Sequence, residues 1–193
     1  MQNTEKNYVV YVTDFGADPT GQTDSAEAVI RAMEQAKKIR REDPEGRITL
    51  DFPRGTYQFY PDKAEERELY VSNTVGANQE YKYKKIGILV EDINHLTVEG
   101  NESQFIFHGQ MTVFAAIRSE DVEFRNFTED FQVPTAVDIT VESVEENMAV
   151  VYIPECYDYA VENGELHWYG ERSPYTGEVY WTGINLSLIH ISE

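Results

Sequence analysis

The sequence predicts an all-β protein, in which a parallel β-helix with an N-terminal capping α-helix is followed by part of a second, antiparallel β unit. Three observations lead to this prediction. One amphipathic helix lies near the N-terminus, the strands that follow it recur with an offset of 26 residues, and the strands after Pro134 alternate around tight turns instead. A hydrophobic content of 41% in 193 residues is compatible with a packed core.

The capping helix is predicted from the segment that follows a short strand, Tyr8–Val12, and a loop rich in Asp, Gly and Pro. Asp24 and Glu27 have the spacing of a capping box, and we expect the helix to run from Asp24 to Arg41. Its apolar face consists of residues at helical spacing, namely Ala26, Val29, Ile30, Met33 and Ala36. Because the first coil of a β-helix would expose unpaired backbone and apolar side chains, we expect this helix to cover that end.

The parallel β-helix is predicted from two segments that can be laid over each other, KKIGILVEDINHLTVEGNESQFIFHG and MTVFAAIRSEDVEFRNFTEDF. With an offset of 26 residues, 88–90 align with 114–116, and Leu96 and Val98 align with Val122 and Phe124. Gly100 aligns with Asn126, and both are residue types that tolerate a left-handed backbone. A repeat of short strands that contains no helix is typical of β-helix coils.

A second unit is predicted at residues 135–185, after the capping helix and β-helix coils of residues 1–134. Apolar and polar residues alternate on both sides of 145–147 and again around Asn163-Gly164, which indicates two antiparallel hairpins. We expect these hairpins to begin a β domain inserted into the β-helix. Residues 186–193, LSLIHISE, fit no strand pattern and resemble a translated sequencing adaptor. We therefore expect them to be an artefact, and the natural protein to continue past Asn185.

Charge limits the classes of partner. Sixteen basic and 35 acidic residues give a net charge of −19, so we expect neither nucleic acid nor a membrane as partner. The first ten residues contain no signal peptide, which indicates a cytoplasmic protein as written and leaves export open if the true start lies upstream. The single cysteine, Cys156, permits no internal disulfide and is expected to be buried or half-buried.

Carboxylates are abundant, but no pair of them has the pattern of a catalytic site. Glu129 and Asp130 are adjacent in a predicted strand, so their side chains are expected on opposite faces. Glu145 and Glu146 fall in a predicted turn and are expected to be surface charges. These pairs therefore offer no matched general acid and base.

Three aspartates of the leading loop, Asp14, Asp18 and Asp24, are oxygen ligands of the kind that hard cations prefer. Asp18 is better explained by a turn and Asp24 by a helix cap. We therefore assign no catalytic, cofactor-binding or metal-binding residue, and we expect no cofactor.

Histidines and aromatic residues are the remaining candidates. His108 lies in an apolar run and is expected to be a hydrogen-bonded histidine in or beside the core. His95 and His167 show no partner pattern, and His190 belongs to the suspected artefact. Five aromatic side chains of the second unit would suit a sugar ring but more often fill a small β core, so the substrate-binding residues stay unassigned. They are Trp168, Tyr169, Tyr175, Tyr180 and Trp181.

The segment VTDFGADPTGQTDSAEAVIRAM, followed by LDFPRGTYQF, resembles the N-terminal signature of the pectate-lyase-like β-helix superfamily. This superfamily contains lyases, hydrolases and phage tailspikes, so the resemblance implies a fold and leaves the chemistry open. A narrower match is carried by FIFHGQMTVF, RNFTEDF and VENGELHWYGE, which are similar to segments of the bacterial α-1,3-galactosidase family of glycoside hydrolases. It extends over most of residues 8–185.

The family resemblance implies a right-handed parallel β-helix that carries inserted antiparallel β-barrel domains. It implies that the full-length parent hydrolyses terminal α-1,3-linked galactose from glycans, with inversion at the anomeric carbon and no organic cofactor. The catalytic carboxylates are expected beyond Asn185, so that this fragment would be inactive. Two alternatives stay open: a non-catalytic, glycan-binding β-helix of the tailspike or adhesin kind, and a pectin-type polysaccharide hydrolase or lyase. An acidic substrate would need a basic groove, and Arg172 is the one basic residue between Asn126 and Asn185.

Overall fold

The structure, a computed structural model, describes residues 6–70, 82–134, 137–146, 148–171 and 180–185. The chain divides into two compact units, residues 1–130 and 131–193. Both are mainly β, and the described residues contain one α-helix. The elements are β1 (Asn7–Tyr11), β2 (Thr20–Asp24), α1 (Ala26–Glu42), β3 (Arg47–Asp51), β4 (Thr56–Phe59), β5 (Glu65–Glu68), β6 (Tyr83–Glu91), β7 (Leu96–Phe107), β8 (Thr112–Ile117), β9 (Val122–Phe131), β10 (Thr140–Glu145), β11 (Met148–Tyr152), β12 (Asp158–Glu162), β13 (Glu165–Tyr169) and β14 (Tyr180–Asn185), with short 3-10 helices at Val12–Phe15 and Pro61–Lys63.

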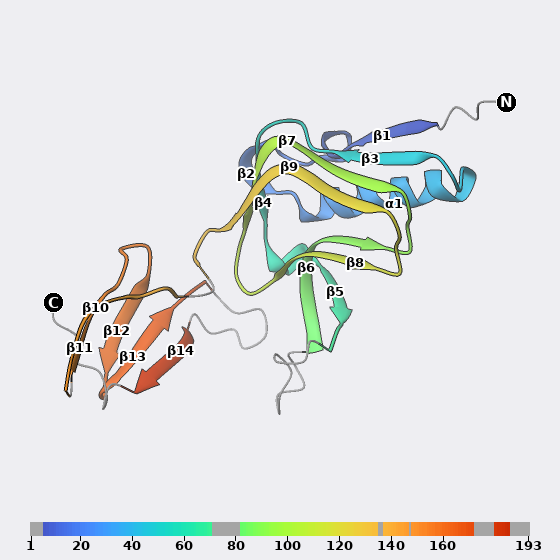
Figure 1. Cartoon of the computed structure of the whole chain (residues 1–193). Coiled ribbons are helices and arrows are strands. Elements are labelled where there is room, and N and C mark those ends of the chain that lie inside the picture. The colour runs from blue at the N-terminus through green and yellow to red at the C-terminus, as the bar shows by residue number, and fades with distance from the viewer. Residues whose placement is uncertain (1–5, 71–81, 135–136, 147, 172–179, 186–193) are drawn as a thin grey trace. The chain divides into compact units, whose positions relative to one another are not determined.

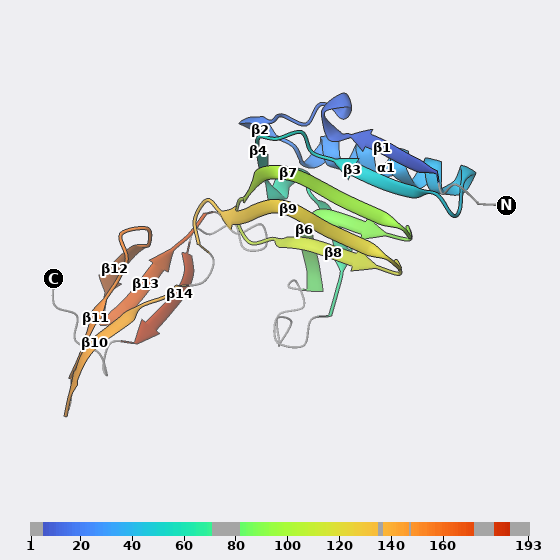
Figure 2. The same cartoon turned by 45° about the horizontal axis from the view of Figure 1, so that its top comes forward.

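The first unit is built on a curled, parallel sheet in the order β1-β3-β7-β4-β2, with β9 added on β7. Strand β7 is long enough to have two partners. Its first part, 96–99, pairs with β3, and its last part, 104–107, pairs with β4. Figures 1 and 2 show β1, β3, β7 and β9 following one another across the unit. The sheet bends within β7, which brings strands far apart in the sequence around one core.

A second sheet of this unit, in the order β5-β6-β8, carries the predicted repeat. Strands β6 and β8 are parallel, and Ile88 pairs with Phe114, Leu89 with Ala115 and Val90 with Ala116. The offset predicted from the sequence is therefore the pairing register of these strands. It recurs in the connections, because the backbone N–H of Ile93 donates to the hydroxyl of Ser119 and that of Glu120 donates to the side-chain amide oxygen of Asn94.

Of the two aligned residues that tolerate a left-handed backbone, Asn126 adopts one and Gly100 does not. Asn101 and Asn126 hold the left-handed positions, with φ of 49° and 58°. Gly100 is required for another reason. A Cβ on this residue would lie 2.5 Å from Phe127 Cβ and 2.8 Å from the carbonyl oxygen of Asn126, so the backbones of β7 and β9 approach too closely for a side chain there.

Helix α1 begins at Ala26 and packs against β1, β3 and β6. The predicted capping box is wrong, because the N-cap is Ser25 and makes no side-chain cap hydrogen bond. Asp24 ends strand β2, and its Oδ1 accepts the backbone N–H of Ala26 at 2.9 Å, while Glu27 pairs with Arg31 and Lys63. The buried face of the helix is close to the predicted one, with Ile30 half-buried; it consists of Ala26, Ala28, Val29, Ala32, Met33 and Ala36.

Aromatic side chains fill the interior of the first unit. The fully buried ones are Phe52, Tyr57, Phe59, Phe105 and Phe107. They stand on facing strands because inward residues alternate along β4 and β7, and Phe105 lies at the centre of the cluster. Its ring centroid is 4.7 Å from that of Phe52 and 4.8 Å from that of Phe127. This cluster fixes which side chains of β4 and β7 face outward.

The second unit is antiparallel, as predicted. Strands β10 and β11 form one hairpin, in which Glu145 pairs with Met148. In the other, between β12 and β13, Glu162 pairs with Glu165 around the predicted Asn163-Gly164 turn, whose φ values of 52° and 80° are those of a type I′ turn. Strand β14 pairs with β13. The prediction for Cys156 is wrong, since the residue is exposed in the connection between β11 and β12.

Some predictions lie outside the described residues. They include the suspected artefact at 186–193 with His190, the residue Tyr175, and the side chains of Tyr180 and Trp181. Among the residues that the structure does describe, no helix is both long and apolar enough to cross a membrane.

Candidate functional site

Charged side chains of the first unit pair across strands with the offset of the predicted repeat. Arg118 donates to both oxygens of Asp92, from Nε at 2.6 Å and from Nη2 at 2.8 Å. The same Nη2 donates to Glu91 Oε1 at 2.9 Å, and Arg67 Nε donates to Glu91 Oε2 at 3.0 Å. The hydrogen bond from Arg67 is the largest cause that holds the pKa of Glu91 below its usual value, against the opposing effect of burial. Glu91 therefore stays ionised.

Among the described carboxylates of the first unit, Glu99 is the most buried, with 9% of the residue exposed. Burial alone would raise its pKa, but three donors outweigh that effect and the pKa is lowered. They are the backbone N–H of Asn101 at 3.0 Å, Arg125 Nε at 2.6 Å and Asn126 Nδ2 at 2.9 Å. Glu99 thus ties the middle of β7 to strand β9 and is fully used as an acceptor.

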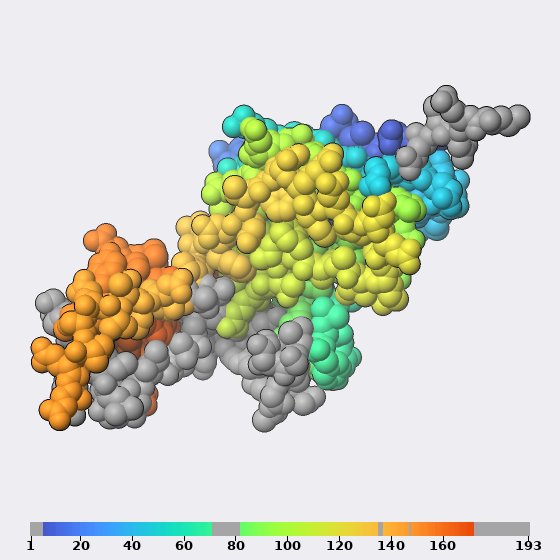
Figure 3. Space-filling view, in the orientation of Figure 1, coloured from blue at the N-terminus to red at the C-terminus, as the bar shows by residue number. Residues whose placement is uncertain are grey.

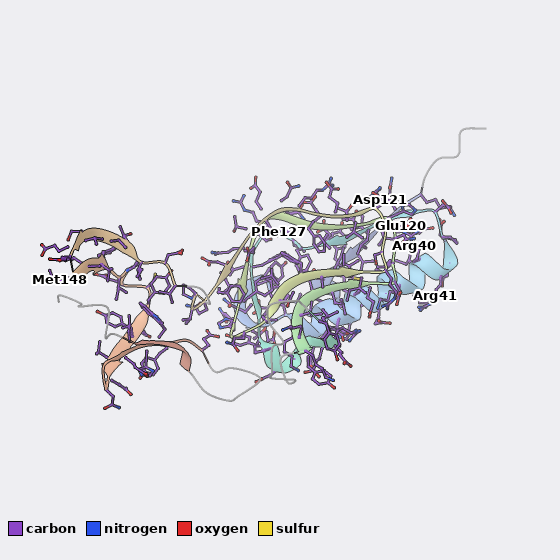
Figure 4. The ribbon with its side chains drawn as sticks, turned by 60° about the horizontal axis from the view of Figure 1, so that its bottom comes forward. Arg40, Arg41, Glu120, Asp121, Phe127 and Met148 are labelled. Atoms are coloured by element: carbon purple, nitrogen blue, oxygen red, sulfur yellow. The ribbon has the colours of Figure 1, made fainter. Side chains whose placement is uncertain are left out.

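The prediction that His95 lacks a partner pattern is wrong. Its Nδ1 lies 2.9 Å from Asp121 Oδ2, which also accepts from Arg47. The hydrogen bond with His95 is the largest cause that lowers the pKa of Asp121. Figure 4 shows Asp121 beside Glu120 and near Arg40, whose Nη2 donates to the carbonyl of His95. His95 thus joins two adjacent turns and orders the corner between them.

These carboxylates do not suit the acid step of glycoside hydrolysis. An inverting hydrolase needs one carboxyl that keeps its proton and a second carboxylate about 6.5–9.5 Å away. In the described part of the chain, every carboxyl group with a resolved pKa shift has its pKa lowered. These groups are Asp18, Asp43, Glu68, Glu91, Asp92, Glu99 and Asp121. Each is held as an anion by its partners, which is what an ion pair or a turn requires.

The leading aspartates do not come together. Asp18 organises its own turn, as predicted: Oδ1 accepts the backbone N–H of Thr20 at 2.9 Å, and Oδ2 accepts that of Thr23 at 2.9 Å. These hydrogen bonds lower the pKa of Asp18 to about 2, with the Thr20 hydroxyl the largest cause. Asp24 Oδ1 binds two backbone N–H groups, and no group of three potential metal ligands occurs among the described residues.

The other predicted positions are structural as well. Glu129 and Asp130 are exposed in β9, and Glu145 and Glu146 are exposed at the end of β10 and in its turn. His167 Nε2 lies 3.5 Å from Glu165 Oε2. None of these arrangements places two carboxyl groups across a cleft.

Of the predicted aromatic residues of the second unit that the structure describes, Trp168 is a core residue and Tyr169 is half-buried. Trp168 is 2% exposed and its ring contacts those of Tyr157 and Tyr159. Tyr169 donates its hydroxyl hydrogen to Glu162 Oε1 at 2.8 Å. Trp168 is therefore closed to a sugar ring.

A different aromatic residue is exposed beside polar groups, on the outward face of β2, β4 and β7. The ring of Tyr60 stacks on that of His108, with centroids 3.9 Å apart and planes 11° from parallel. His108 is 7% exposed, which confirms the prediction of a hydrogen-bonded histidine beside the core. Its Nε2 lies 2.7 Å from Gln58 Oε1, and because that amide oxygen can only accept, Nε2 carries the proton and donates. Asp24 pairs with Gln58 across the sheet.

The contacts of His108 with Tyr60 and Gln58, and the His95–Asp121 pair, were not predicted, for different reasons. Asp121 follows His95 by the offset of the predicted repeat, so the repeat itself contained the signal. Tyr60 and His108 instead follow the register by which β4 pairs with β7, where Gln58 lies opposite Ile106. The predicted repeat does not include the offset between paired residues of β4 and β7.

No protein-family model matches the chain. Curated relatives do. The chain is 50% identical over 189 residues to an α-1,3-galactosidase A from Peterkaempfera griseoplana and 48% identical over 181 residues to one from Streptomyces avermitilis. It is 32% identical over 164 residues to an α-1,3-galactosidase B from Bacteroides thetaiotaomicron.

These alignments cover 96%, 92% and 84% of this chain and 25%, 28% and 25% of the respective relatives. The chain thus spans about a quarter of the length of the relatives that it matches. Its resemblance to the α-1,3-galactosidases, predicted from sequence segments, is confirmed over nearly its whole length.

Proposed function

We propose that the chain is part of a glycoside hydrolase that releases terminal α-1,3-linked galactose from glycans with inversion at the anomeric carbon. The observation that carries the proposal is the 50% identity over 96% of the chain to a protein named α-1,3-galactosidase A. The net charge of −19 agrees with a neutral glycan as substrate, because phosphate, sulfate or uronate groups would be repelled. No organic cofactor is needed, since water and two carboxyl groups complete the reaction.

The residues of this chain have a supporting part in that proposal. Glu91, Glu99 and Asp121 have lowered pKa values and are engaged with basic partners, so they suit the scaffold rather than the acid step. We place the general acid and the general base in the part of the protein that corresponds to the remaining three quarters of the relatives. The chain of residues 1–193 is then inactive by itself.

We also propose that the curled sheet is the start of a right-handed parallel β-helix, with α1 covering its first coil and residues 135–185 belonging to an inserted domain. The parallel pairing of β6 with β8, in the register of the predicted repeat, supports this. So does the aromatic cluster: Phe105 and Phe107 are fully buried, whereas Phe114, Phe124 and Phe127 on β8 and β9 are half-buried. Figure 3 shows β9, in yellow, along the visible face of the first unit. A further coil on β8 and β9 would cover these rings.

The test is hydrolysis by the full-length protein. Its reading frame is recovered by sequencing the source DNA across the codon for Asn185, and the product is incubated with an α-1,3-linked digalactoside while proton NMR records the first anomer released. We expect β-galactose from the longer protein and no galactose from residues 1–193. α-Galactose as the first product would refute inversion. Binding without hydrolysis by the longer protein would favour a non-catalytic glycan-binding protein, and galactose released by the short chain would refute the assignment of the carboxyl groups.

A further inference from the structure

Tyr60 presents one ring face to solvent. The residue is 38% exposed although His108 covers one side of its ring at a centroid distance of 3.9 Å, so the exposed area belongs to the other side and to the hydroxyl edge. His108 is itself fixed, since its Nε2–H donates to Gln58 Oε1 and its backbone N–H donates to the carbonyl of Phe59. The Tyr60 ring is therefore a rigid platform that loses little conformational freedom when a flat ligand stacks on it.

Polar groups around this ring retain hydrogen-bonding capacity. In the described part of the chain, the Tyr60 hydroxyl, the Gln58 amide nitrogen and Asp24 Oδ2 have no hydrogen-bond partner, whereas Gln58 Oε1 and Asp24 Oδ1 are engaged. Asp24, Gln58 and Ile106 are paired across β2, β4 and β7, whose neighbouring strands lie about 4.8 Å apart. One bound molecule on Tyr60 can thus meet a donor, an acceptor and a hydroxyl group.

Charge restricts the kind of molecule. The Asp24 carboxylate would repel an anionic sugar, and Lys63, in the 3-10 helix that follows Tyr60, is already paired with Glu27 at 3.7 Å. Hydroxyl groups suit a carboxylate acceptor and an amide donor. An apolar C–H face suits the open side of a tyrosine ring. A neutral pyranose has both features, and galactose presents a continuous C–H face because its 4-hydroxyl is axial.

We propose that Asp24, Gln58, Tyr60, Ile106 and His108, here called the Tyr60 surface, form a non-catalytic subsite for a neutral galactosyl unit of a glycan. Tyr60 stacks on the C–H face of the sugar and its hydroxyl group hydrogen-bonds a sugar oxygen, Asp24 Oδ2 accepts from one sugar hydroxyl group, and the Gln58 amide donates to another. The choice of galactose rests on the proposed function, while the preference for a neutral sugar rests on the surface itself. The subsite holds the glycan and takes no part in bond cleavage.

The experiment is a titration of ¹⁵N-labelled chain with the methyl glycoside of α-1,3-linked digalactose, followed by amide chemical shifts. We expect shifts at Gln58, including its side-chain amide, at Tyr60 and at His108. Tyr60→Leu should weaken binding by about tenfold or more, because the stacked ring is lost. Tyr60→Phe keeps the ring and should weaken binding by about threefold, because one hydrogen bond is lost. The methyl glycoside of galacturonic acid should bind more weakly than that of galactose.

Tyr11→Leu is the matched control, since Tyr11 is 46% exposed on the edge strand β1, away from these polar groups. It should leave binding unchanged. Shifts that map elsewhere on the wild-type chain, or equal binding by Tyr60→Phe, Tyr60→Leu and wild type, would overturn the proposal. The shift map and Tyr60→Phe keep the test decisive if Tyr60→Leu does not fold.

This titration is independent of hydrolysis. If the longer protein cleaves α-1,3-linked digalactose but the Tyr60 surface binds no galactoside, the subsite is refuted and the proposed function stands. If the surface binds galactoside but the longer protein cleaves none, the proposed function is refuted and the subsite stands.

Discussion

Asp92 and Arg118 occupy equivalent positions of the repeat, both have a left-handed backbone, with φ of 56° and 49°, and their side chains form a bidentate ion pair. The two turns that they occupy therefore have the same conformation and are stacked in register. A left-handed backbone is costly for residues with a side chain, so each turn must be maintained by its surroundings. The pair between them is one such constraint, and the contact of His95 with Asp121 at the next corner is another.

The strain at Arg118 predicts an unusual order of two variants. Arg118→Ala and Arg118→Gly both remove the ion pair, but only glycine relieves the left-handed backbone. We expect Arg118→Gly to unfold about 2–4 °C above Arg118→Ala in thermal melts. Arg125 provides the matched control, because it also pairs across strands but has no left-handed φ. At residue 125 the order of melting temperatures should reverse, with Arg125→Gly unfolding below Arg125→Ala. The same order at both sites would contradict the assignment of backbone strain to Arg118.

Gly100 should tolerate no side chain. The Cβ of Gly100→Ala would lie 2.5 Å from Phe127 Cβ, so β7 and β9 must separate, and we expect a loss of about 1–3 kcal/mol in the free energy of unfolding in urea. Gly16→Ala is the control. Its nearest neighbour would be Arg31 Nη2 at 3.7 Å, so its cost of about 1 kcal/mol comes from φ of 95° alone. A smaller loss for Gly100→Ala than for Gly16→Ala would show that the two strands are not closely packed there.

The sequence could predict those features that depend on local patterns or on the repeat of strands. The hairpin at Asn163-Gly164, the turn of Asp18 and the pairing of β6 with β8 are of this kind. The capping box failed because Asp24 pairs in a strand with Gln58, a contact that helix-start patterns do not contain. On β7 the left-handed backbone is at Asn101 and Glu102 and not at Gly100, because tolerance of that conformation does not show where it occurs.

The contacts of the Tyr60 surface could not be predicted from the sequence. These contacts follow the register of β4 with β7, which the predicted repeat of β6 with β8 does not contain. Tyr60 contacts His108 only because β4 and β7 pair in the folded chain. The catalytic carboxyl groups left unassigned from the sequence are unassigned still, since the described carboxylates serve ion pairs, turns and exposed surface.

Glu99 should be required for stability. Glu99→Ala leaves Arg125 Nε, Asn126 Nδ2 and the N–H of Asn101 without their shared acceptor. We therefore expect a loss of about 1–3 kcal/mol in the free energy of unfolding, measured in urea. Glu123→Ala is the control, since Glu123 lies on β9 beside Arg125, is half exposed and pairs with that same arginine at 3.2 Å. This variant should change the free energy of unfolding by no more than about 0.5 kcal/mol. Equal effects of the two variants would mean that Glu99 is an ordinary surface charge.

Asp18 should make the stability of the chain depend on pH in the acid range. Its pKa is lowered from 3.8 to about 2 in the folded chain, so the folded state favours the carboxylate. The stabilisation is complete above pH of about 4 and is lost as the pH falls towards 2, because the proton then displaces the hydrogen bonds from Thr20 and Thr23. The difference in melting temperature between wild type and Asp18→Asn should therefore shrink between pH 5 and pH 2, roughly the window that the two pKa values set. Asp14→Asn is the control. It removes the same charge from the same loop, but the Asp14 carboxylate accepts no hydrogen bond from the described residues. The difference in melting temperature between wild type and Asp14→Asn should therefore not shrink in this way. A wild-type minus Asp18→Asn difference that is constant across this range would show that the turn does not depend on the ionised carboxylate.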